Sequence, residues 1–122
     1  MLLKDFYKIE EREEIDNVHV FRLFLNPKHE IYKGHFPDFP IMPGVCSMQI
    51  VKECASLVLG QEIQHKEIKT CKFVSAVNPN ENSSLLLKLK LSDPTDGIIV
   101  INANIEAADK IVLKFKSHSI LK

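Results

Sequence analysis

The chain has 122 residues, of which 45% are hydrophobic and 26% charged, a balance typical of one globular domain. Its 16 basic and 16 acidic residues cancel, so the chain as a whole has no net charge to attract nucleic acid or an anionic membrane. No apolar run approaches the ~20 residues that cross a bilayer, and the charged residues at the amino terminus are not typical of a signal peptide. We expect a single domain over residues 1–122 that binds neither nucleic acid nor membranes.

The three cysteines, Cys46, Cys54 and Cys71, cannot all pair with one another. Cys46 and Cys54 fall in one predicted helix, where eight residues separate them by about 12 Å, which is too far for a disulfide. This pattern favours a reducing compartment, the cytoplasm. No histidine lies near either in the sequence, so we expect both to be packing residues rather than nucleophiles.

The first half of the chain predicts two strands and a helix. Residues 6–12 and 18–25 have strand-like patterns and are separated by a charged, turn-like segment, residues 13–17. Residues 45–59 contain no Gly or Pro, and their apolar positions recur at intervals of three and four, which predicts a helix that ends at Gly60. Apolar residues cover most of its circumference, so we expect the helix to be buried.

The second half of the chain changes to a period of two, typical of strands. Four strands are predicted between turns rich in Asn, Asp, Pro and Gly; they fall within residues 62–77, 85–91, 99–105 and 111–116. The sequence therefore predicts an α+β domain in which an antiparallel sheet covers one helix. Such a sheet must curl strongly, or a second subunit must close the open side, and this predicts a homodimer.

One segment carries candidate chemistry. Prolines at positions 37, 40 and 43 make the loop before the helix stiff, so it can hold His35 in place as a general acid or base. Gly44 falls at the start of the helix, where free N–H groups and the helix dipole suit a carbonyl oxygen that gains negative charge. Together they indicate proton abstraction beside a thioester carbonyl. The alternative is a proline-rich loop in which His35 is only a packing residue.

This segment resembles a known signature. Residues 34–37 (Gly-His-Phe-Pro) and 40–45 (Pro-Ile-Met-Pro-Gly-Val), followed by a helix, closely resemble the signature of the 3-hydroxyacyl-acyl carrier protein dehydratases of fatty-acid synthesis. Residues 72–81 also resemble the strand of that family that ends in a proline turn. The resemblance implies the hotdog fold, in which a curled antiparallel sheet wraps one long helix.

The resemblance also implies a mechanism. Members of that family are dimers with two active sites across the interface, act on chains carried by acyl carrier protein, and need no metal or redox cofactor. By resemblance, His35 acts on the C2 proton and the Gly44 amide holds the thioester carbonyl. A carboxylate on the partner's helix, five residues after that glycine, assists departure of the hydroxyl group.

At that carboxylate position this chain has Gln49, whose amide has no acidic proton to give. Three interpretations follow. In the first, His35 both takes the C2 proton and returns it to the hydroxyl, with Gln49 orienting the substrate or water. Glu53, one turn further along the helix, could supply the acid; otherwise we expect it to be solvated or salt-bridged. Alternatively, the site binds acyl thioesters without dehydrating them, or hydrolyses them as a thioesterase.

Further residues are assigned to binding. The candidates for lining the acyl tunnel are Phe36, Phe39, Met42, Pro43, Val45, Met48 and Phe73. A basic rim for an acidic carrier protein would use Lys28, Lys33 and Lys72. The remaining histidines show no spacing typical of metal ligands, so no metal site is predicted. The leading prediction is a dehydratase that interconverts a 3-hydroxyacyl thioester and its trans-2-enoyl product.

Overall fold

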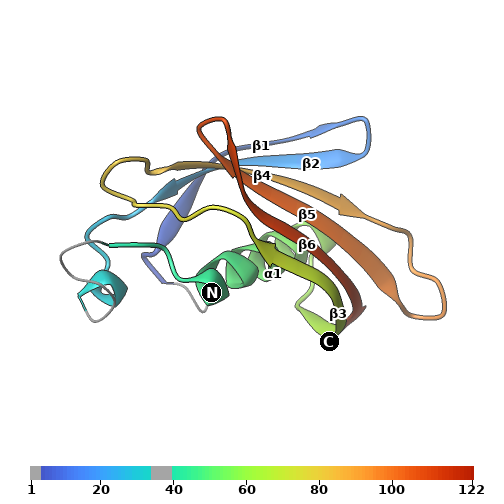
Figure 1. The fold of residues 1–122 in the computed structure, drawn as a ribbon. Coiled ribbons are helices and arrows are strands. Elements are labelled where there is room, and N and C mark those ends of the chain that lie inside the picture. Colours follow the sequence, from blue (N-terminus) through green and yellow to red (C-terminus); the bar gives the residue numbers. More distant parts are fainter. Residues whose placement is uncertain (1–3, 34–39) are drawn as a thin grey trace.

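The structure is a computed structural model that describes residues 4–33 and 40–122 (Figure 1). These residues form a curved sheet and one long helix. The elements in chain order are β1 (Tyr7–Ile15), β2 (Val18–Leu25), the short 3₁₀ helix η1 (Glu30–Tyr32), α1 (Gly44–Leu59), β3 (Ile63–Phe73), β4 (Ser84–Leu91), β5 (Ile99–Ala107) and β6 (Lys110–Leu121).

The strands make one antiparallel sheet in the order β1-β2-β4-β5-β6-β3. The strand β3 follows α1 in the chain but pairs with β6, so β1 and β3 form the two edges of the sheet. Figure 1 shows the sheet bending around α1, which lies along its concave face. The predicted α+β architecture, one helix covered by a curled antiparallel sheet, is confirmed.

The core lies between α1 and the inward face of the sheet. Leu85, Leu87 and Leu89 of β4 are buried, while Lys88 between two of them and Lys90 after the last are exposed, as the period of two predicts. From the helix, the buried apolar side chains that pack into this core are Cys46, Ile50, Val51, Cys54 and Ala55. Each fully buried aliphatic side chain contributes about 1.5–3 kcal/mol, so this contact fixes the helix on the sheet.

The first hairpin differs from its prediction. The strand β1 continues to Ile15, and only Asp16 and Asn17 form the turn, with φ of 51° and 66°. Two successive residues with positive φ are typical of the tight turn that matches the twist of a hairpin. Residues 13–14 were predicted to be a turn because they are charged; instead they pair with β2 at an exposed end of the sheet.

The helix begins at Gly44 and ends at Leu59, and Gly60 follows in the left-handed conformation with φ of 69°. Its bounds therefore agree with the prediction, and in the single chain it is buried on one side only. The polar residues Ser47 and Glu53 are buried, whereas Val45 and Leu57 are 72% and 45% exposed. The sheet covers only one side of the helix, so an apolar residue on the opposite side stays open in the single chain.

Cys46 and Cys54 are buried and free, as expected for packing residues. Burial raises the pKa of the Cys54 thiol to about 12, so it stays protonated at neutral pH. Within residues 4–33 and 40–122, none of the helices is long and apolar enough to cross a membrane.

A half-buried histidine, His65, lies on the edge strand β3 beside β6. His65 Nδ1 is 2.8 Å from Ser119 Oγ and 3.0 Å from Ser117 Oγ. Its Nε2 atom is buried with no hydrogen-bond partner among the described residues. Burial, and to a smaller extent the charge of Lys52, lower the pKa of His65.

This environment predicts acid sensitivity. The unfolded chain takes up a proton at His65 near its ordinary pKa of about 6.5, while the folded chain takes it up only at lower pH. The free energy of unfolding should therefore fall as pH drops from about 6.5 through the folded pKa. His65→Gln, which titrates no proton, should lose less stability between pH 7.5 and pH 5 in urea denaturation. An equal loss in both proteins would contradict this expectation.

Candidate functional site

The first turn of α1 has an open amino-terminal end. Pro43 precedes it with extended backbone geometry and provides no side-chain cap. The Pro43 carbonyl accepts from the amides of Cys46 and Ser47, at 3.0 and 3.4 Å. The amides of Gly44 and Val45 have no acceptor within the described residues. Two N–H groups are therefore available at the positive end of the helix dipole.

The loop leading into this turn is anchored to the chain that follows β3. The amide of Met42 donates to the carbonyl of Val77 at 2.9 Å, and the Met42 side chain is buried. The predicted catalytic His35, and Phe36 and Phe39 of the predicted tunnel, lie outside the described residues.

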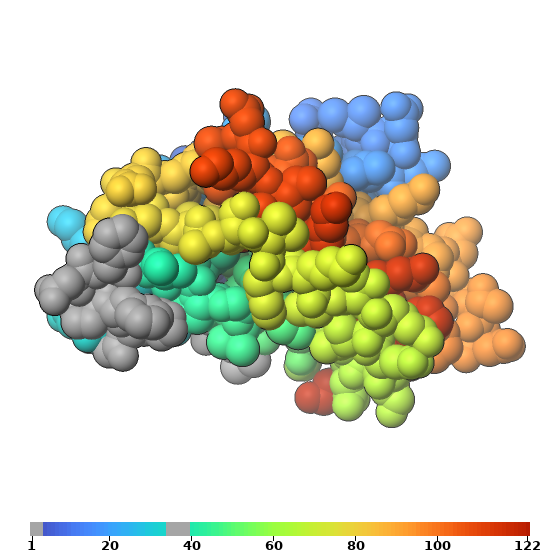
Figure 2. Space-filling view, in the orientation of Figure 1, coloured from blue at the N-terminus to red at the C-terminus, as the bar shows by residue number. Residues whose placement is uncertain are grey.

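A cavity of about 560 Å³ surrounds the start of the helix. It brings together five predicted site residues, which are Met42, Gly44, Val45, Met48 and Phe73. Ile41, Ser47, residues 74–77 and Val112 complete its lining, while Pro43 caps the helix beside it. Figure 2 shows the start of the helix and the segment after β3 meeting on one face of the molecule. The cavity is mostly apolar and open, which suits an acyl chain.

Phe73 lies directly against Gly44. A Cβ atom added to Gly44 would lie 2.8 Å from Cε1 and Cζ of the Phe73 ring, closer than real Cβ contacts. The side chain is 56% exposed, so the ring rests on the helix end from the solvent side. A side chain at position 44 would therefore displace the Phe73 ring, and glycine also leaves the amide accessible.

A second polar group lies further along the helix. Glu53 is only 8% exposed; its Oε1 accepts from the hydroxyl of Tyr7 at 2.9 Å and its Oε2 from Nε2 of Gln49 at 3.1 Å. The expectation that Glu53 is solvated is thus wrong. Sequence reasoning did not select Tyr7, because a tyrosine at the start of a strand carries no signal of a partner 46 residues away. Burial raises the pKa of Tyr7 far above its ordinary value, so the hydroxyl keeps its proton.

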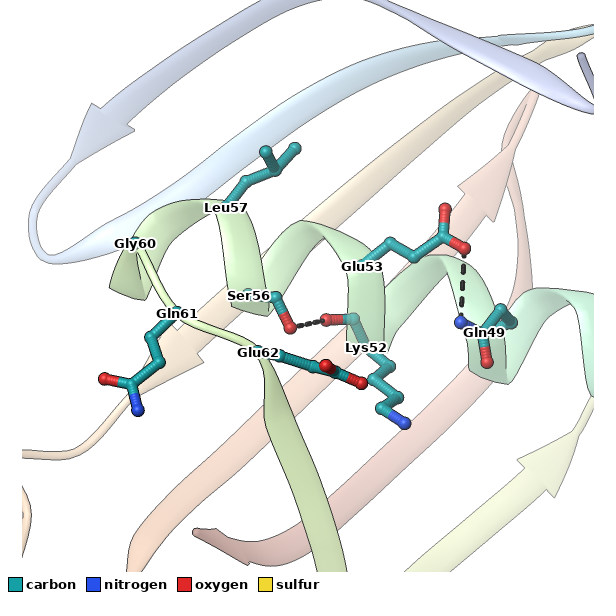
Figure 3. Close-up of a pocket in the computed structure, with 8 residues that line it drawn as sticks. All are labelled: Gln49, Lys52, Glu53, Ser56, Leu57, Gly60, Gln61 and Glu62. Atoms are coloured by element: carbon teal, nitrogen blue, oxygen red, sulfur yellow. Dashed lines mark hydrogen bonds between the residues drawn. The ribbon is translucent and has the colours of Figure 1, made fainter. Parts of the chain in front are cut away.

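Gln49 and Glu53 line a second cavity, a groove of about 640 Å³. Its remaining lining residues are Lys52, Ser56, Leu57, Gly60, Gln61 and Glu62 (Figure 3). Gly44 does not line this groove, and Gln49 does not line the cavity around Gly44. Five residues along a helix correspond to a rotation of about 140° and a rise of about 7.5 Å. One chain alone therefore does not bring Gly44 and Gln49 to the same cavity.

The lysines predicted to contact a carrier protein are all exposed, but they lie on different elements. Lys28 and Lys33 flank η1, whereas Lys72 pairs in register with Lys114 of β6 on the outer face of the sheet. Within residues 4–33 and 40–122, no three His, Cys, Asp or Glu side chains gather in a group that could hold a metal ion.

The architecture, a long helix wrapped by a curled antiparallel sheet, is the hotdog fold, and solved structures share it. The dehydratase heterocomplex ApeI:P of Xenorhabdus doucetiae superposes with a TM-score of 0.73 and 24% identity, over 93% of this chain and 96% of that one. A hypothetical thioesterase with coenzyme A from Streptococcus pneumoniae gives 0.69 and 14%, over 95% and 85%. Dehydratase and thioesterase structures are thus both similar in fold.

A family model of ApeI-like dehydratases matches residues 10–99, and the chain belongs to this family. Curated relatives include 3-hydroxyacyl-[acyl-carrier-protein] dehydratases FabZ. That of Bacillus licheniformis is 28% identical over 67 residues, 49% of this chain and 46% of the relative. That of Levilactobacillus brevis is 28% identical over 83 residues, 62% and 56%. The chain spans about half the length of these relatives. The predicted fold and family resemblance are confirmed.

The contact between Gly44 and Phe73 can be tested directly. Gly44→Ala should push the Phe73 ring outward, because the ring is half exposed and has room to move while the helix backbone does not. We expect a loss of stability below about 1 kcal/mol in urea denaturation, since alanine also favours the helix. Phe73→Ala in the same chain should remove the penalty. A large loss that the second substitution does not relieve would contradict the contact.

Proposed function

We propose that this protein dehydrates a 3-hydroxyacyl thioester, carried on acyl carrier protein, to the trans-2-enoyl thioester. The observation that carries the proposal is the start of α1, where the amides of Gly44 and Val45, which have no acceptor among residues 4–33 and 40–122, lie beside an apolar cavity. Membership in a dehydratase family supports the same chemistry. Dehydration moves a proton and a hydroxide, so it needs no metal or redox cofactor.

The Gly44 amide would hold the thioester oxygen. Abstraction of the C2 proton places negative charge on that oxygen, and an N–H group at the positive end of a helix stabilises such charge. The acyl chain would extend along Met42, Met48 and Phe73, whose side chains line the same cavity. Catalysis then depends on a base close to C2.

His35 is the proposed base, ten residues after β2 and nine before the helix. It would take the proton from C2, a double bond would form between C2 and C3, and the C3–O bond would break. The same histidine would return the proton to the departing hydroxide, giving water. Gln49 cannot supply this proton, because a carboxamide donates hydrogen bonds without losing a proton at usable pH. In this proposal Gln49 orients the hydroxyl group.

The second candidate is a thioesterase or an acyl-thioester binding protein. It is favoured by the similarity in fold to a hypothetical thioesterase with coenzyme A and by Gln49 in place of a carboxylate. Hydrolysis would release a free thiol and a carboxylic acid, whereas dehydration keeps the thioester. The two functions therefore differ in their products.

The purified protein should convert a 3-hydroxyacyl thioester to the enoyl thioester, followed by mass spectrometry. His35→Ala should lower kcat at least about 100-fold, the usual contribution of a general acid–base group. His19→Ala, at a histidine on β2 that faces Glu14 across the hairpin, is the matched control and should keep full activity. No enoyl product would refute the dehydratase, and an equal rate in His35→Ala would refute His35 as its base. Thiol release without an enoyl product would establish hydrolysis.

We also propose a homodimer, because Gly44 and Gln49 line different cavities in one chain and a second chain could join them. Exposed apolar side chains gather on α1 and on and just beyond the edge strand β3; these are Val45, Leu57, Ile68, Phe73 and Val74.

An acidic carrier protein would bind to a basic surface of this protein, for which Lys28, Lys33 and Lys72 remain the candidates. Cytoplasmic localisation stays a prediction that depends on the free cysteines.

Light scattering after gel filtration should give the mass of two chains. Ile68→Lys places a charge in the middle of β3 and should shift the protein to the mass of one chain while it stays folded, because Ile68 is exposed in the single chain. Ile15→Lys, at an exposed position on the far edge strand β1, is the control and should stay dimeric. A single-chain mass for the unsubstituted protein would contradict the dimer.

A further inference from the structure

The contacts of Gln49 fix which way its side-chain amide points. The nitrogen donates to Glu53 Oε2 at 3.1 Å, and a carboxylate oxygen accepts hydrogen bonds, so the nitrogen and not the oxygen must face Glu53. The amide oxygen therefore faces the other way, as Figure 3 shows. It has no hydrogen-bond partner within the described residues and is not among the buried unpaired atoms. Gln49 thus presents an acceptor in the groove.

Glu53 is itself held in place. Its second oxygen accepts from the hydroxyl of Tyr7, which reaches it from β1 at 2.9 Å. Tyr7 is 7% exposed, and its ring is anchored in the core between the sheet and α1. Gln49, one helical turn away, and Tyr7, on the edge strand β1, therefore both donate hydrogen bonds to the Glu53 carboxylate. Neither contact can change without moving the carboxylate that fixes Gln49.

We propose that Tyr7 and Glu53 are positioning residues that hold the amide oxygen of Gln49 toward the groove, where, in the proposed dimer, it accepts a hydrogen bond from the hydroxyl group of the 3-hydroxyacyl chain bound beside Gly44 of the second chain. The inference rests on the proposed dehydratase function. The substrate group that binds the Gln49 oxygen is then the hydroxyl and not the thioester carbonyl, because a carbonyl oxygen cannot donate a hydrogen bond.

This assignment makes the proton balance explicit. A hydroxyl that donates to Gln49 has a lone pair free on its oxygen, and that lone pair receives the proton that His35 removed from C2. The C3–O bond then breaks and water leaves with both protons. Gln49 loses and gains none, and the orientation of the hydroxyl depends on an amide whose nitrogen is hydrogen-bonded to Glu53. A carboxylate one turn away thus acts through Gln49 and need not touch the substrate.

The test exchanges the carboxylate and the amide between positions 53 and 49. In Glu53→Gln the new side-chain oxygen accepts from Tyr7 and the new NH2 group faces Gln49, so the Gln49 amide turns its oxygen toward position 53 and away from the groove. We expect kcat to fall about tenfold with KM within about twofold, the size of one lost hydrogen bond to a charged group. Adding Gln49→Glu restores the pairing with reversed chemistry, because the amide at position 53 donates to the carboxylate at position 49. The double variant should recover kcat to within about threefold.

Two further variants keep the test independent of folding. Tyr7→Phe removes only the hydroxyl, and kcat should fall about threefold while the melting temperature changes little. Glu106→Gln makes the same carboxylate-to-amide change at a residue that pairs with Lys88 at 3.0 Å on the outer face of the sheet, and it should leave kcat unchanged. Full activity in Glu53→Gln, or no recovery in a folded double variant, would overturn the proposal.

A spectroscopic readout separates this inference from the proposed function. In a ¹⁵N–¹H spectrum, the amide proton of Gln49 that is bonded to Glu53 should be shifted downfield and distinct from its geminal partner. The shift should disappear in Glu53→Gln and persist in Glu106→Gln. If the shift is present but no enoyl product forms, the dehydratase function fails while the positioning of Gln49 stands. If enoyl product forms and the shift is absent, the positioning is refuted.

Discussion

The structure depends on the burial of one side of a single helix against the concave face of the sheet. Ile50, Val51, Cys54 and Ala55 meet the inward-facing leucines and isoleucines of the strands, and no other helix of comparable length in the described residues shares that face. The sheet has to bend to enclose this one stripe. The direction of every other residue on α1, toward the sheet, the solvent or a cavity, follows from that contact.

Helical geometry then divides the candidate site. The first turn presents backbone amides to one cavity, and the second turn presents Gln49 to another. The polar residues on the buried side need partners, because an unpaired buried carboxylate costs several kcal/mol. Ser47 donates to the carbonyl of Gly44 at 2.7 Å, and Glu53 accepts from Tyr7 and Gln49. Burial of Glu53 is thus tolerated because a strand from the sheet edge supplies a donor.

Local patterns predicted most of the fold. The change from a period near 3.6 to a period of two located α1 and the later strands, and Gly60 ended the helix because only a left-handed residue fits there. The start of α1 at Gly44 followed from the proline-rich segment. The predicted acyl-binding residues Met42, Met48 and Phe73 meet in one cavity because the Met42–Val77 hydrogen bond brings two distant loops together.

What sequence reasoning missed depends on contacts between distant segments. Apolarity alone does not say which side of the helix the sheet covers, so Val45 and Leu57 were expected to be buried. Residues 13–14 were predicted to be a turn because they are charged. The sequence pattern does not show that they lie at an exposed end of the sheet, where a strand tolerates charged side chains. The contact of Tyr7 with Glu53 joins residues 46 positions apart, and it exists only because β1 crosses near the helix.

The hydrogen-bonded pair of Gln49 and Glu53 also constrains which substitutions at these two positions are compatible during evolution. Two residues one turn apart can exchange an amide and a carboxylate through two single substitutions, with no shift of the backbone. The order of the two steps matters. An intermediate with two carboxylates would place like charges about 3 Å apart in a partly buried place, whereas one with two amides stays neutral there. An intermediate with two amides thus avoids two adjacent acidic groups, one of which would have to hold a proton.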